Sequence, residues 1–90
     1  MDVPVHAEAH YLLGCCLHWN DLDLTAALGH FTQAQDQGFG DFWVRYNRGT
    51  LYAKLSRPGE AREDLEACLS LRPGHEGVCG ALAALPARMV

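Results

Sequence analysis

The sequence lacks three features that would each point to a particular class of protein. No apolar run approaches the ~18 residues that a membrane-spanning helix needs. Residues 1–10 contain neither a basic start nor an apolar stretch, so a secretory signal is not expected. The seven Lys and Arg residues are scattered along a chain of formal charge −4, which leaves no basic cluster for nucleic acid. We therefore expect a cytoplasmic protein with no membrane and no nucleic-acid partner.

The four cysteines lack the spacing of a metal or redox motif. Cys15 and Cys16 are adjacent, Cys68 and Cys79 lie far along the chain, and no CxxC pair occurs. Adjacent cysteines do not easily bridge each other, which argues against a disulfide framework. We interpret all four as reduced, small, mostly buried apolar residues of a cytosolic protein.

What the sequence does contain is apolar periodicity of the helical kind along most of its length. Turn signals divide it, because Gly38 follows the second segment, Pro58 suits the first turn of the fourth, and Pro73 with Gly74 ends that helix. No alternating strand pattern of useful length occurs, so the predicted class is all-α. The five expected helices are "VHAEAHYLLGCCLHW", "DLDLTAALGHFTQAQDQG", "DFWVRYNRGTLYAKL", "GEAREDLEACLSLR" and "HEGVCGALAAL".

These helices come in two similar pairs. Aligning Gly14 with Gly49 gives a period of thirty-five residues, which becomes thirty-four in the later matches. A small residue in the first helix of a pair lets the second helix approach closely, while a large apolar residue fills the gap. The matched positions are Leu17 with Tyr52, Ala27 with Ala61, Phe31 with Leu65, and Ala34 with Cys68.

The pattern resembles the tetratricopeptide repeat, a helix–turn–helix unit of about 34 residues. The chain departs from the family where His10 and Arg45 replace a frequent Trp, and where Arg48 replaces an apolar residue. A plain helical bundle with chance similarity is the alternative. The resemblance is carried in the second unit by Gly49, Tyr52, Ala61, Leu65 and Pro73, and in the first by Leu13, Gly14, Ala27, Phe31 and Ala34.

The resemblance implies one domain over residues 1–90, stacked as a short right-handed superhelix. Repeat one would span about 5–38, repeat two about 40–73, and a capping helix about 75–85. Two repeats are few, since each buries its face only against neighbours. The last helix, "GALAAL", is also apolar on several sides where a cap should be polar. The chain could therefore form a homodimer through this end, dock an obligate partner, or be part of a longer protein.

In repeats of this family the first helix of each pair lines a concave groove. The resemblance implies a protein–protein interaction module, a scaffold or adaptor that binds a partner peptide or helix there. Trp43 and Tyr46 would supply apolar area, Asn47 would bond a partner backbone, and Lys54 would meet an acidic group. The alternative for Trp43 is packing in the core. The full set of expected contacts is Trp43, Tyr46, Asn47, Thr50 and Lys54, with Tyr11, Cys15 and Trp19 weaker.

Two neighbouring features complete this expectation. Phe39 and Phe42 are expected to pack at the junction between repeats. Some tetratricopeptide domains hold a chaperone's C-terminal carboxylate with Lys and Asn residues, but here only Asn47 matches that arrangement. Tyr11 and Cys15 stand where the first helix would supply Lys and Asn. We therefore expect an apolar or aromatic contact instead.

Metal and catalytic sites remain incomplete in the sequence. His6 and His10 lie one helical turn apart, as do His75 and Cys79, but their helices are the first and fifth and cannot share an ion. Cys16 and His18 are two residues apart and point away from each other on a helix. The glycines are dispersed and form no phosphate loop. We expect no metal, no cofactor and no enzymatic activity.

The charged run "GEAREDLEA" in the fourth helix is the last feature of note. Glu60 and Asp64 lie at one-turn spacing, and Arg62 faces Glu66. We interpret the run as a solvated convex face.

Overall fold

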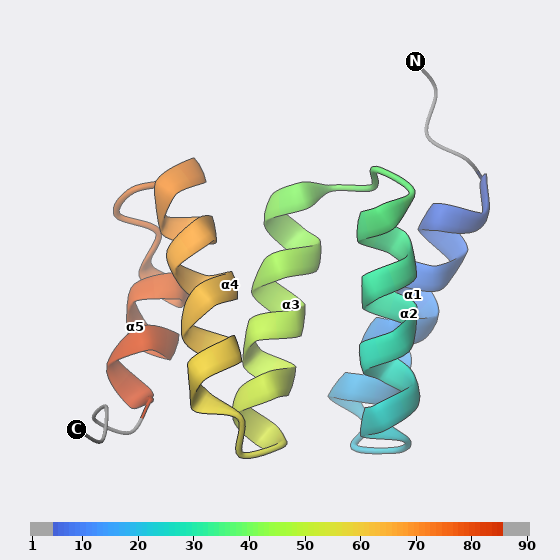
Figure 1. The fold of residues 1–90 in the computed structure, drawn as a ribbon, viewed down its shortest axis with the longest axis horizontal. Coiled ribbons are helices and arrows are strands. Elements are labelled where there is room, and N and C mark those ends of the chain that lie inside the picture. The colour runs from blue at the N-terminus through green and yellow to red at the C-terminus, as the bar shows by residue number, and fades with distance from the viewer. Residues whose placement is uncertain (1–4, 86–90) are drawn as a thin grey trace.

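The computed structural model describes residues 5–85, which form five α-helices joined by short turns (Figure 1). The helices run antiparallel as two pairs, α1 with α2 and α3 with α4, and α5 lies beyond α4. No strand occurs in this part of the chain, so the predicted all-α class is confirmed. The helices are α1 (Val5–Trp19), α2 (Leu24–Asp36), α3 (Asp41–Lys54), α4 (Pro58–Leu71) and α5 (Glu76–Ala84).

The ends of the helices are set by an N-cap residue, a first-turn proline and left-handed glycines. Asp23 caps α2, because its carboxylate accepts a hydrogen bond from the Ala26 backbone N–H at 3.0 Å. Pro58 is the first residue of α4, where its missing N–H leaves no partner unsatisfied. Gly38 and Gly74 follow α2 and α4 at φ +84°, a left-handed conformation that ends a helix readily only at glycine.

The two helix pairs are built on the same contact. A Cβ atom on Gly14 would lie 2.9 Å from Cδ1 of the Phe31 ring, and one on Gly49 would lie 2.8 Å from Cγ of Leu65. Phe31 and Leu65 are both fully buried. The small-against-large equivalence that the sequence repeat predicts is therefore present in the packing of both pairs.

Two apolar clusters hold the stack together. The first joins α2 to α3, with half-buried side chains of α1 packed on it, and the second joins α3, α4 and α5. Phe39 packs against the first cluster, at the junction between the two helix pairs as expected. Phe42 belongs to the second cluster and packs toward α4 and α5, so the prediction that it lies at this junction is wrong. The buried members are Ala27, Phe31, Ala34, Val44 and Leu51 in the first cluster, and Phe42, Leu65, Cys68 and Val78 in the second.

Candidate functional site

The predicted groove residues of α1 and α3 meet around one buried amide, that of Asn47. Its Oδ1 accepts a hydrogen bond from the indole Nε1 of Trp19 at 3.1 Å. Its Nδ2 donates to Oη of Tyr11 at 3.0 Å and to the Trp43 carbonyl at 2.9 Å. An indole nitrogen can only donate, so this contact fixes which way the amide points. Four of the eight predicted residues are thus joined through a single side chain.

Asn47 itself is withdrawn from solvent, with only 5 % of its surface exposed. Both amide hydrogens and the amide oxygen already have partners within the chain. Its observed task is to orient Trp19 and to tie α1 to α3. A hydrogen bond from Asn47 to a partner backbone stays a prediction, and it would require one of these bonds to open.

Thr50 and the buried His18 form a second link between α1 and α3. The Thr50 hydroxyl donates to the Asn47 carbonyl at 2.9 Å, so its oxygen accepts from Nε2 of His18 at 3.0 Å. This bond sets the tautomer and leaves Nδ1 of His18 without a partner. Burial and, to a smaller extent, the nearby Lys54 ammonium lower the pKa of His18 to about 4. His18 is therefore neutral near pH 7.

Lys54 closes the end of the same surface. Its Nζ donates to the His18 carbonyl at 2.9 Å and pairs with Asp21 at 3.1 Å. It also lies 5.4 Å from the ring centroid of Trp19, within the range of a cation–π contact. A contact between Lys54 and an acidic group of a partner stays a prediction, and it would require the ion pair with the exposed Asp21 to open.

Trp43 is exposed, which decides between the two alternatives for this residue. It keeps 43 % of its surface in solvent, and Trp19 keeps 56 %. Tyr46 is half-buried; its ring lies 6.2 Å from that of Trp43 and 5.8 Å from that of His75. The guanidinium of Arg72 lies 5.4 Å from the Trp43 ring centroid. Trp43 therefore is not part of the core. Its ring packs against four side chains, called the Trp43 cluster below: Phe42, Tyr46, Arg72 and His75.

Tyr11 and Cys15 are half-buried at the floor of this surface. Burial raises the pKa of Tyr11 to about 12, and burial also raises the pKa of the Cys15 thiol above its ordinary value. Both groups are therefore protonated near pH 7. A thiol in this state is a poor nucleophile, so the arrangement suits contact rather than covalent chemistry.

Arg72 and His75 belong to the Trp43 cluster, and the sequence did not predict them as part of the site. Arg72 stacks on Phe42 as well as on Trp43, and His75 contacts three of the rings. His75 also caps α5, since its Nδ1 accepts from the Val78 N–H at 3.3 Å. His is not among the residues preferred at this position, so only its place directly after Pro73 and Gly74 could have signalled the cap.

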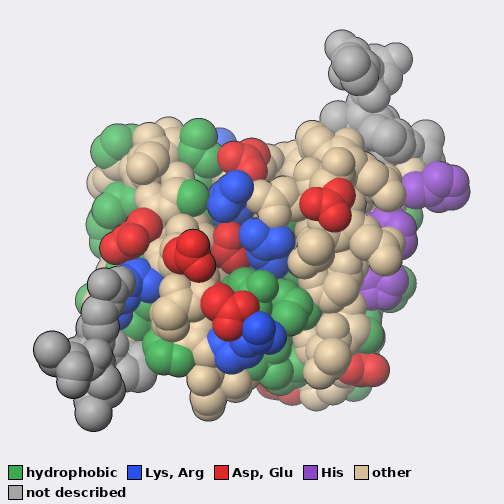
Figure 2. Space-filling view, viewed as in Figure 1, with side chains coloured by type: hydrophobic (Ala, Val, Ile, Leu, Met, Phe, Trp, Pro, Cys, Tyr) green, Lys and Arg blue, Asp and Glu red, His purple; other side chains and the backbone are tan. Residues whose placement is uncertain are grey.

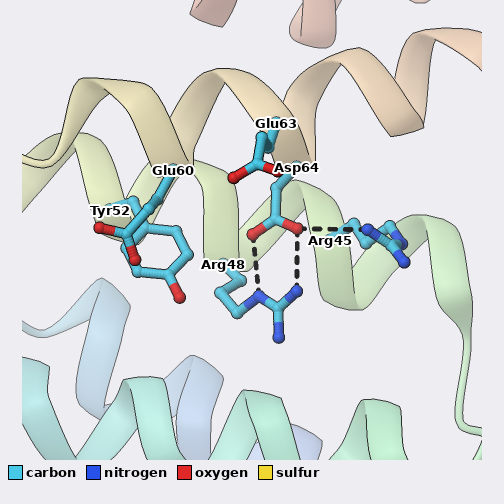
Figure 3. A pocket seen from close by; sticks show the side chains of 6 residues that line it. All are labelled: Arg45, Arg48, Tyr52, Glu60, Glu63 and Asp64. Atoms are coloured by element: carbon cyan, nitrogen blue, oxygen red, sulfur yellow. Dashed lines mark hydrogen bonds and ion pairs between the residues drawn. The ribbon is translucent and has the colours of Figure 1, made fainter.

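A second hollow lies between α3 and α4, with a volume of about 170 Å³ (Figure 3). Arg48 binds Asp64 through two bonds, Nε to Oδ2 at 2.8 Å and Nη2 to Oδ1 at 2.9 Å. Arg45 adds a third at 3.4 Å. The hydrogen bonds that Arg48 donates to Asp64 raise the pKa of Arg48, so its guanidinium stays charged. The hollow is lined by Arg45, Arg48, Tyr52, Glu60, Glu63 and Asp64.

This pair corrects the prediction for the charged run of α4. Asp64 is only 3 % exposed, so that member of "GEAREDLEA" is not solvated. It is buried because Arg48, at a position where the family has an apolar residue, supplies its counter-charge. Around it, charges of both signs alternate across this face of the molecule (Figure 2). The hollow is lined by charged side chains of both signs, some of which pair with one another, so it presents no surface of a single charge sign to a ligand.

The comparisons with known proteins bear on the second helix pair. A family model described as tetratricopeptide repeat matches residues 44–75, which cover most of α3 and all of α4. The two helix pairs and final helix are consistent with two such repeats and a capping helix. No curated protein and no solved structure matches the chain. Among residues 5–85, no helix is long and apolar enough to cross a membrane.

Proposed function

We propose that the chain is a protein–protein interaction module, on the basis of the match of residues 44–75 to the tetratricopeptide repeat. Its partner would be a peptide or helix that lies along the surface made by α1 and α3. The observation that carries the proposal is the pair of exposed tryptophans. Trp19 is 56 % and Trp43 43 % exposed, yet both rings have partners within the chain. The Trp19 indole donates to Asn47, and the Trp43 ring packs against Phe42, Tyr46 and His75.

Such an arrangement suits binding for an energetic reason. Exposed aromatic rings supply much of the apolar area of interface hot spots. A side chain that is already held in place loses little conformational entropy when a partner covers it. In this proposal Trp19, Trp43 and Tyr46 supply apolar area, and Lys54 meets an acidic group. Asn47 holds the Trp19 ring and is itself held by Tyr11, Thr50 links α3 to α1 through His18, and Cys15 lies beneath this surface.

As part of the proposal, we place the module in the cytoplasm as a scaffold or adaptor. All four cysteines are free, which suits a reducing compartment. Self-association through α5 is the competing function. The large apolar side chains of α5 give it little support, because Val78 is buried and Leu82 is half-buried against the second cluster. Light scattering over a concentration series should show a persistent monomer; a dimer would favour the competing function.

The binding proposal is tested by capture of partners from native lysate. The intact chain is compared with a Trp19→Ala, Trp43→Ala double variant, because Tyr46 also packs against α5 and is better left in place. The matched control is Leu13→Ala. Leu13 is 46 % exposed on α1 but lies two residues from Tyr11, so it points away from the groove.

We expect a partner that the intact chain and the Leu13 variant retain and the double variant loses, with helical circular dichroism unchanged in all three. The purified partner should then shift tryptophan emission to shorter wavelength, since both tryptophans of the chain lie on this surface. Equal capture by all three proteins, or an unshifted emission, would contradict groove binding.

A further inference from the structure

Two histidines from different helices meet where α1 and α2 lie together. Nδ1 of His10 lies 3.0 Å from Nδ1 of His30. The ring centroids are 5.2 Å apart, which is close to that nitrogen separation plus the two ring radii. The rings therefore meet edge to edge, with their nitrogens facing one another. One neutral imidazole must donate and the other accept, so the pair shares a proton.

A third histidine stands one turn away on α1. His6 is exposed and precedes His10 by four residues, a spacing that puts both side chains on one helix face. Figure 2 shows histidine side chains gathered along the edge of the molecule where Figure 1 places α1 and α2. In the described part of the chain no three His, Cys, Asp or Glu side chains already converge as metal ligands. The pair is formed, and His6 needs a rotation of its exposed side chain to join it.

We propose that His10 and His30, joined by His6, bind a divalent transition-metal ion at this edge. Imidazole nitrogen is a preferred ligand of Zn²⁺, Cu²⁺ and Ni²⁺. In the square-planar or tetragonal coordination of Cu²⁺ and Ni²⁺, two metal–nitrogen bonds of about 2.0–2.1 Å at right angles hold their nitrogens roughly 3 Å apart. The 3.0 Å between the two Nδ1 atoms is that separation. Water molecules would fill the remaining positions on the ion.

When the metal ion binds, it takes the place of the proton between the two Nδ1 atoms. The neutral pair keeps the same number of protons. The histidine that donates through Nδ1 moves its proton to Nε2, and the rings tilt until both Nδ1 lone pairs point to the ion. Because the ligands come from α1 and α2, the ion ties these helices together only in the folded chain. Metal binding should therefore raise the melting temperature.

The structure also explains why the sequence pattern could not find this site. In the sequence, His6 and His10 share their one-turn spacing with His75 and Cys79, which are the other candidate metal ligands. Those residues lie at or on α5, at the opposite end of the stack from α1 (Figure 1). The third ligand is instead His30, which comes from the adjacent helix α2.

The test uses Ni²⁺ with the full chain, because Ni²⁺ does not oxidise thiols. Calorimetric titration near pH 7.5 gives affinity and stoichiometry, and thermal unfolding with and without Ni²⁺ gives the stabilisation. The variants are His30→Gln and His6→Gln. The control is the double variant Cys16→Ser, Cys79→Ser, which removes the two exposed thiols that could bind metal by themselves.

We expect one Ni²⁺ per chain and a rise in melting temperature that a chelator reverses. His30→Gln should weaken the affinity at least tenfold, His6→Gln several-fold, and the cysteine control should bind as the intact chain does. His10→Gln serves as a second pair variant if His30→Gln loses its helical circular dichroism. The site is overturned if the intact chain binds no Ni²⁺, if either histidine variant keeps full affinity, or if only the cysteine variant loses it.

Discussion

His18 is fully buried on α1, next in sequence to the exposed Trp19. The Thr50 hydroxyl accepts a hydrogen bond from Nε2 of His18, and the lone pair of Nδ1 has no hydrogen-bond partner. Protonation would add a buried N–H with no acceptor, next to the Lys54 ammonium. This local arrangement is the reason that the pKa of His18 falls to about 4.

The depressed pKa of His18 predicts that acid weakens the fold between pH 7 and pH 5. An unfolded histidine has a pKa near 6.5, so at pH 5 the unfolded chain binds a proton that folded His18 rejects. Stability should therefore fall by about 2 kcal/mol as the pH drops from 7 to 5. Urea unfolding at the two pH values measures this loss, and His18→Gln should remove it. An equal loss in the variant would show that other groups are responsible.

At the scale of the element, each helix pair depends on a glycine that carries no side chain into its neighbour. Gly14 faces the Phe31 ring and Gly49 faces Leu65, each at a separation that leaves no room for a methyl group. Gly29, in the middle of α2, has nothing within 4 Å of the position a Cβ would take. The same residue type therefore serves packing at two positions and has no packing role at the third.

Alanine substitution should separate these roles. Gly49→Ala forces Leu65 out of its place and should destabilise the chain by about 1–3 kcal/mol. Gly29→Ala meets no neighbour and gains helix propensity, so it should stabilise by roughly 0.5–1 kcal/mol. Denaturant unfolding of the two variants gives both values. Shifts of the same sign would mean that the close approach of α3 to α4 is not what Gly49 provides.

At the scale of the whole molecule, the helices form a line in which each element is held by its neighbours. The α5 helix is the shortest and packs chiefly against α4. Its approach to α3 depends on Gly77, where a Cβ would lie 2.7 Å from Oη of Tyr46. The Trp43 cluster therefore lies against α5, the helix with the fewest packing contacts among those of the described chain.

This arrangement predicts that α5 opens independently of the rest. Its amide hydrogens should exchange faster than those of α3 and α4, because local opening of a terminal element breaks few contacts. Gly77→Ala should speed exchange in α5 further and leave α1 and α2 unchanged. Hydrogen exchange followed residue by residue provides the measurement. Protection of α5 equal to that of α4 would show one cooperative unit instead.

The sequence by itself determined the helices and their pairing. Gly14 against Phe31 and Gly49 against Leu65 were predictable, because a repeat period and helical spacing are local properties of the chain. Pro58 and Gly74 marked their turns for the same reason. Within α3, spacing likewise puts Trp43, Asn47 and Thr50 along one stripe of the helix.

Only the tertiary structure decided which polar side chains are buried and what satisfies them. Asn47 joins Trp19 and Tyr11, and Arg48 holds Asp64. His10 meets His30. Each of these contacts crosses from one helix to another, and it depends on how the two helices are rotated and how closely they approach. No spacing within one helix encodes that rotation, whereas a buried polar group must find a partner once the packing sets it.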